Sequence, residues 1–179
     1  MKLELTFAEA TIVNTAIWAL EKMPPRNRRL HGLFKVLWFA NLDHIKRHGL
    51  PLFPDNFLAM RYGPVPSVLF RFFEKDRCPD AFKGYFERAG EKGEIRALRP
   101  CDESYLSETA KESIERSIAE NGDLSFNDAV DKSHGEAWKA ARSQGESVTI
   151  RMNEILDEIG ASDELRREVM EDLAARSAL

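Results

Sequence analysis

The spacing of apolar residues predicts helices over most of the chain. Thr6 and Glu9 have the spacing of a capping box, which starts a first helix that Pro24 brings to an end. A second helix is predicted from about Leu30 to His48, where Gly49 provides a natural stop. The apolar stripe of this second helix consists of Leu30, Leu33, Phe34, Leu37, Trp38 and Ile45.

The pattern changes after Gly49. The segment from Leu50 to Val65 holds three of the eight prolines and is expected to be extended chain and turns, with a short strand at residues 57–60. Gly63-Pro64-Val65-Pro66 is predicted to be a rigid turn, because each proline fixes φ and removes a backbone donor. A third helix is expected from Ser67 to about Asp76.

Short strands and further helices are predicted beyond this point. Residues 83–100 indicate a β hairpin with strands at 85–87 and 95–98, joined through Gly90 and Gly93. Ser107 is expected to cap a fourth helix that Asn121 and Gly122 stop. Ser125 opens another short helix that ends near residue 134, and more helices are expected around residue 138, at 155–159 and after 160. We therefore predict a mainly α fold, a single compact helical domain over residues 1–179 with a small β hairpin.

Composition and charge narrow the function classes. The 179 residues are enough for one domain with a core, and the net charge of −4 argues against a general nucleic-acid binder. The charge is uneven, because residues 145–179 carry nine acidic and four basic side chains, which predicts acidic C-terminal helices. The chain has neither a run of about 18 apolar residues nor a signal-peptide pattern, so we expect a cytoplasmic protein without a membrane span.

Few residues are arranged for catalysis or metal binding. His44 and His48 are four positions apart on one predicted helix and could face one metal ion, but Ile45 stands where a zinc-protease helix has glutamate, and no third ligand is apparent. Cys78 and Cys101 form no C-x-x-C pair and are expected to be reduced thiols. Because a nucleophile elbow and a phosphate-binding loop are also missing, we expect no enzyme activity, cofactor or metal. A metal-binding enzyme centred on His44 and His48 stays as an alternative.

Aromatic residues give the stronger signal. Nine of the eleven phenylalanines lie between Phe34 and Phe86. On the predicted third helix, Phe70 is turned about 100° from Leu69, so it is either buried by another element or exposed on a patch that marks a partner site. Trp138 is expected to be a structural anchor whose indole N–H needs a partner; His134 could supply one or cap the preceding helix.

Several short motifs occur in order over residues 35–139. Lys35 is followed by an aromatic stretch ending in Ala40-Asn41 and by His44, and residues 59–60 precede the Gly-Pro-Val-Pro segment. Leu106-Ser107-Glu108 comes next, and Ser133-His134 precedes Ala137-Trp138. This ordered set resembles the Panacea domain of SocA-like antitoxins, although Asn41 stands where aspartate is frequent in the family.

The resemblance implies an antitoxin that neutralises a cognate toxin by direct binding. Some related members resemble adaptors that deliver a toxin to a cytosolic protease, and others are phage-associated proteins, so a regulator without a toxin stays as a second alternative. We expect a protein partner, and neither nucleic acid nor membrane. The residues predicted to bind the partner are Tyr62, Gly63, Pro64, Val65, Pro66 and Phe70. The residues predicted to be structural are Trp38, His44, Ser107, His134 and Trp138.

Overall fold

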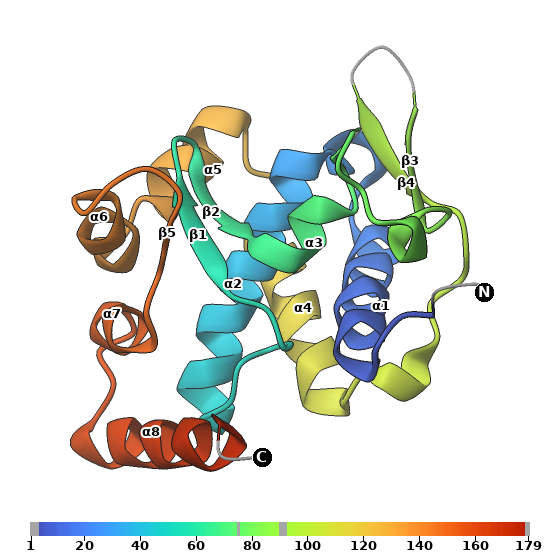
Figure 1. Cartoon of the computed structure of the whole chain (residues 1–179). Helices are drawn as coiled ribbons and strands as arrows, with labels where there is room; N and C mark the ends of the chain where they lie inside the picture. Colours follow the sequence, from blue (N-terminus) through green and yellow to red (C-terminus); the bar gives the residue numbers. More distant parts are fainter. Residues whose placement is uncertain (1–3, 75, 90–92, 178–179) are drawn as a thin grey trace.

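The computed structural model describes residues 4–74, 76–89 and 93–177 (Figure 1). Within these ranges the chain is mainly α, with small antiparallel strands, which confirms the predicted fold class. The helices are α1 Phe7–Lys22, α2 Leu30–His48, α3 Ser67–Arg71, α4 Glu108–Asn121, α5 Phe126–Ser133, α6 Glu136–Arg142, α7 Met152–Glu158 and α8 Asp163–Ser177.

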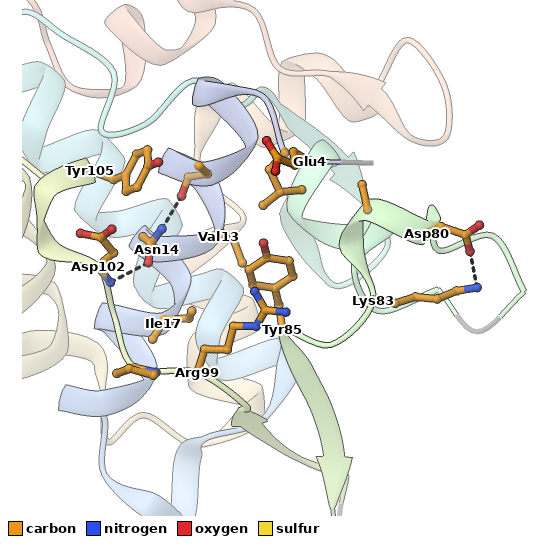
Figure 2. Close-up of a pocket in the computed structure, with 14 residues that line it drawn as sticks. Glu4, Val13, Asn14, Ile17, Asp80, Lys83, Tyr85, Arg99, Asp102 and Tyr105 are labelled. Atoms are coloured by element: carbon orange, nitrogen blue, oxygen red, sulfur yellow. Dashed lines mark hydrogen bonds and ion pairs between the residues drawn. The ribbon is translucent and has the colours of Figure 1, made fainter. Parts of the chain in front are cut away.

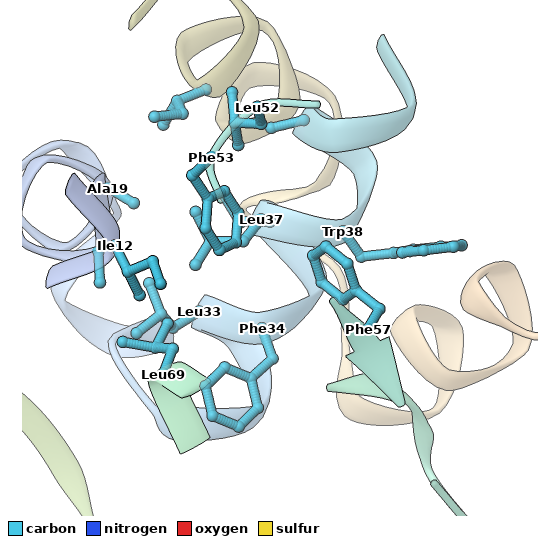
Figure 3. Packing of buried hydrophobic residues seen from close by; sticks show 14 of the residues in the cluster. Ile12, Ala19, Leu33, Phe34, Leu37, Trp38, Leu52, Phe53, Phe57 and Leu69 are labelled. Atoms are coloured by element: carbon cyan, nitrogen blue, oxygen red, sulfur yellow. The ribbon is translucent and has the colours of Figure 1, made fainter. Parts of the chain in front are cut away.

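Helix α2 is the centre of the molecule. It contacts α1, α4 and α5 as well as the second strand, and its apolar stripe is buried as the periodicity predicts, except for the half-buried Leu30. Figure 3 shows Leu33 of α2 between Ile12 of α1 and Leu69 of α3. Trp38 is fully buried, with its ring 5.0 Å from that of Phe57. Because the buried side chains of α2 pack against several other elements, this helix is the centre of the hydrophobic core.

The ends of the first two helices follow from their sequences. The Thr6 hydroxyl accepts the N–H of Glu9 at 3.2 Å, and the Glu9 carboxylate accepts the N–H of Thr6 at 2.8 Å, which confirms the capping box. Gly49 ends α2 with φ +67°, a left-handed conformation that glycine adopts without strain.

The Gly63-Pro66 segment is a strand rather than the predicted turn. Strand β2 (Gly63–Pro66) pairs antiparallel with β1 (Phe57–Met60), and β5 (Val148–Thr149) pairs with the other side of β1. The N–H of Ser67 donates to Asn56 O, so the alternate residues Pro64 and Pro66 face away from β1. The two prolines therefore remove no hydrogen bond between β2 and β1. A turn was predicted because prolines are rare in strands other than edge strands.

The second sheet is the predicted hairpin, with slightly different bounds. Strand β3 spans Phe86–Ala89 and β4 spans Glu94–Ala97, while Gly90 lies outside the described residues. Helix α3 ends at Arg71, earlier than predicted, and the chain then turns so that the Phe72 ring stacks on Phe82 at 3.8 Å. Aromatic packing between loops has here replaced further helical turns.

The remaining elements lie on either side of α2. Helices α6, α7 and α8 are on one side and the β3–β4 hairpin is on the other (Figure 1). No helix among the described residues is long and apolar enough to cross a lipid bilayer. Cys78 and Cys101 are both half-buried free thiols.

Candidate functional site

The motif residues come together around the β1–β2 turn. The Lys35 ammonium of α2 donates to the Pro64 carbonyl oxygen at 3.2 Å, and the Trp138 indole N–H of α6 donates to Met60 O at 2.9 Å. The His134 ring lies flat on the Trp138 ring with centroids 3.6 Å apart. We call the following residues the motif cluster: Lys35, Gly63, Pro64, Ser133, His134 and Trp138.

Gly63 is required where these elements meet. Its φ is +103°, which side chains rarely adopt, and a Cβ atom built on it would lie 2.6 Å from Lys35 Nζ and closer still to Ser133 Oγ. Any larger residue would therefore strain the backbone and displace the side chains of Lys35 and Ser133.

Lys35 is a buried basic side chain that no acidic side chain among the described residues pairs with. Its relative exposure is 2%, and Pro64 O is its hydrogen-bond acceptor. Because Pro64 faces the outer side of the edge strand, the ammonium satisfies a carbonyl that β1 cannot reach. Burial lowers the pKa of Lys35 to about 7.

Two histidines flank this lysine. Burial, and next the charge of Lys35, lower the pKa of His31 to about 4, and the same causes in the same order lower the pKa of His134. The Nε2 atoms of both rings are buried and have no hydrogen-bond partner among the described residues. Both imidazoles are therefore held mainly neutral at pH 7, with one ring nitrogen unused.

Exposed aromatic rings lie directly outside the motif cluster. Tyr62 is 50% exposed and Phe126 is 51% exposed, and their ring centroids are 5.7 Å apart. The His31 ring lies 4.3 Å from Phe126, and the Arg61 guanidinium lies 5.2 Å from the Tyr62 ring centre. We call Tyr62, Phe126, His31 and Arg61 the aromatic patch. Large exposed rings held on short, fixed elements are typical of protein interfaces.

The predicted partner-binding residues differ in their exposure to solvent. Tyr62 is exposed, while Val65 and Phe70 are half-buried. Phe70 packs edge-on against Phe34 with centroids 6.2 Å apart, so neither of the two alternatives for its side chain describes it completely. The other three predicted residues, Gly63, Pro64 and Pro66, are buried.

Sequence reasoning missed Phe126 and His31. The spacing of Phe126 from Ala129 and Val130 is that of an apolar helix face, which would have predicted burial, and only the fold shows that the first turn of α5 projects beyond its neighbours. His31 carried no signal, because its role depends on the β1–β2 turn, which is distant in sequence.

Of the residues predicted to be structural, Ser107 and His134 lie at helix ends, and Trp138 is half-buried. The Ser107 hydroxyl accepts the N–H of Ala110 at 3.1 Å and so caps α4. The Trp138 N–H has found Met60 rather than His134, and His134 instead follows α5 as its C-terminal cap residue.

One of the paired histidines of α2 already has a protein partner at each ring nitrogen. His44 Nδ1 lies 2.7 Å from Leu50 O and its Nε2 lies 3.2 Å from Thr109 Oγ1, so both ring nitrogens are engaged by the protein. The His48 ring is 4.9 Å away from that of His44. Across the described ranges, no group of three or more His, Cys, Asp or Glu side chains is placed to hold a metal ion.

A wide hollow of about 590 Å3 lies elsewhere, between α1, the loop before β3 and the segment after β4 (Figure 2). Its polar groups largely satisfy one another. Asp80 pairs with Lys83 at 2.5 Å, the Asn14 amide oxygen accepts the N–H of Asp102, and Arg99 stacks on Tyr85. None of the motif cluster lines this hollow. We therefore place the candidate site at the aromatic patch and the motif cluster.

Comparison with protein families gives one match, which includes the motif cluster. Residues 33–139 match the family described as "Antitoxin SocA-like, Panacea domain". The matched segment begins just before Lys35 and ends just after Trp138, so it contains the whole motif cluster. No curated protein and no solved structure matches the chain.

Proposed function

We propose that this chain, which belongs to the family of SocA-like antitoxins with a Panacea domain, neutralises a cognate toxin by binding it directly. The family membership supports an antitoxin-like role and a protein partner. The toxin and its binding surface are our inference. The observation that carries the inference is an exposed aromatic patch held rigidly by the residues of the family motif.

The arrangement suits binding. Tyr62 projects from a two-residue turn whose strands are fixed by Lys35 and Trp138, and Phe126 projects from the first turn of α5. Rings held in this way lose little conformational entropy when a partner covers them. Tyrosine and arginine, both present in the aromatic patch, are the residue types that most often dominate binding energy.

In this proposal, some of the predicted partner-binding residues contact the toxin and others only hold the turn in shape. Tyr62 makes direct contact, and the half-buried Val65 and Phe70 contribute their exposed edges. Gly63, Pro64 and Pro66 act indirectly, because they are buried and hold the turn in shape.

The test is co-expression of the chain with the candidate toxin encoded beside its gene. The wild type should restore growth and bind the toxin, and Tyr62→Asp and Phe126→Asp should each weaken binding more than about 30-fold, as expected for the loss of a central aromatic contact. Toxin abundance should be measured as well, because neutralisation by occlusion leaves it unchanged and delivery to a protease lowers it.

Phe7→Asp is the matched control. Phe7 is 76% exposed, and the first turn of α1 lies at the other end of the molecule from α5 (Figure 1). This variant should rescue growth as well as the wild type does. Full rescue by Tyr62→Asp and Phe126→Asp would move the interface elsewhere, and a wild type that neither binds nor rescues would refute the antitoxin proposal.

A further inference from the structure

A small pocket lies beneath the aromatic patch, between α2 and the start of α5. Its volume is about 80 Å3, several times the roughly 10–15 Å3 that one water molecule needs. The residues that carry the argument are Asn27, Arg29, His31, Lys35, Asn121 and Phe126, all of which line it. The space suits one small polar group and is far too small for a nucleotide.

The charge of the pocket has a single sign. Its two ionisable basic chains are Arg29 and Lys35, and no aspartate or glutamate of the described residues lines it. Within the described ranges, the Arg29 guanidinium has neither a hydrogen bond nor an ion pair of its own. The pocket also lies at the N-terminal end of α5, where the helix dipole adds partial positive charge.

The pocket also holds unused hydrogen-bonding capacity. The relative exposure of Lys35 is 2%, and the Pro64 carbonyl oxygen accepts only one of the three hydrogen bonds that a protonated lysine can donate. Among the described residues, His31 Nε2 is buried and has no partner, but in the neutral ring it is an acceptor and adds no donor. In contrast, the Asn27 amide already donates to Gly122 O, and Asn121 Oδ1 already accepts from Lys132. The groups with donors to spare are thus Lys35 and Arg29, which an acceptor with negative charge would satisfy together.

We propose that this pocket binds one oxyanion group, either a carboxylate or a phosphate. Arg29 would hold it from the rim, while Lys35 would hold it from within. An oxyanion offers several acceptor positions, so it can accept from both basic side chains at once. Two sources share this chemistry: an acidic side chain of a protein partner, which could enter beside Phe126, and a free phosphate ion.

The experiment uses the isolated chain labelled with 13C and 15N. The His31 and Phe126 ring signals are followed by NMR at pH 7 while sodium acetate or sodium phosphate replaces sodium chloride at constant ionic strength. We expect saturable shifts at both rings. Arg29→Gln should raise the Kd roughly tenfold, as the loss of one charge-assisted hydrogen bond predicts, and Lys35→Met should abolish the shifts.

The controls separate a site from general charge effects. Arg167→Gln removes the same charge from the exposed surface of α8 and should leave the Kd unchanged. Arg29 is exposed, so its variant reports on the pocket even if Lys35→Met disturbs folding. Equal Kd values in Arg29→Gln and Arg167→Gln, or no saturable shift in the wild type, would overturn the proposal.

The two anions identify the source. Tighter binding of acetate supports an acidic side chain as the natural occupant, and tighter binding of phosphate supports a free ion. Because no toxin takes part, the result is independent of whether the chain neutralises its neighbour's product.

Discussion

Replacing Gly63 with alanine tests whether the family motif acts as a packed junction. The new Cβ would lie 2.6 Å from Lys35 Nζ and closer to Ser133 Oγ, on a backbone with φ +103°. The strained backbone should cost about 1–2 kcal/mol, and the crowded contacts should add roughly 1–3 kcal/mol. We therefore expect the free energy of unfolding to fall by about 3 kcal/mol, which corresponds to a melting temperature about 6–12 °C lower in a domain of this size.

The assay is urea unfolding followed by circular dichroism, with the slope m checked for changes in the unfolded state. Gly160→Ala is the matched control, because Gly160 has φ +62° but nothing within 4 Å of the added Cβ. It should cost only the backbone part, about 1 kcal/mol. In addition, Ser133→Ala removes the nearest atom, so Gly63→Ala should cost about 1 kcal/mol less in that background.

Equal costs for Gly63→Ala and Gly160→Ala would refute the reasoning. That result would mean that the space around Gly63 adjusts freely, and that the glycine is present only for its φ angle. The account of Gly63 as the point where α2, β2 and α5 meet would then be wrong.

Three further outcomes follow from the same site. Relative to Lys35→Met, the free energy of unfolding of the wild type should rise from pH 7 to pH 9 by about 1–2 kcal/mol, measured by urea unfolding. The folded pKa of Lys35, about 7, lies below the unfolded value of 10.5, so the unfolded chain binds more protons over this range. A difference that does not change with pH would contradict the lowered pKa of Lys35. Trp138→Phe should lose about 1–2 kcal/mol, since Met60 O is left without its donor, and no loss would show that water replaces it. Ser107→Ala should cost about 1 kcal/mol by removing the cap that Ala110 uses, as thermal unfolding would show, and an unchanged melting temperature would contradict it.

Local sequence patterns predicted most of the helices. They failed where the conformation of a segment depends on contacts with residues distant in sequence. The bounds of α2 follow from its apolar period and Gly49, and both capping serines were identified because caps are local. In contrast, β5 was not predicted, since two residues gain their strand conformation only by pairing with β1. The Gly63–Pro66 strand was interpreted as a turn because its prolines are compatible with a strand only at an edge, and sequence cannot show which strand is the edge.

The candidate site was only partly predictable for the same reason. The family motifs were visible as residues in order, and Tyr62 was included because it adjoins them. The burial of Lys35 was not foreseen, because a lysine in a helix pattern is normally exposed and its partner Pro64 lies in another element. Phe126 was missed because helix periodicity places it on the inner face.

The aromatic patch and the pocket share His31 and Phe126, so one partner could contact both. A partner segment with an acidic side chain next to an apolar one would cover Phe126 and place its carboxylate between Arg29 and Lys35. Burying Lys35 without a counter-ion costs stability in the free chain, and a partner carboxylate would remove that cost on binding. An apolar partner alone could not do so, and a partner with a basic group at that position would be repelled. In this proposal the buried lysine would favour discrimination between partners over stability of the free protein, and the exposed rings would supply affinity for the partner that satisfies it.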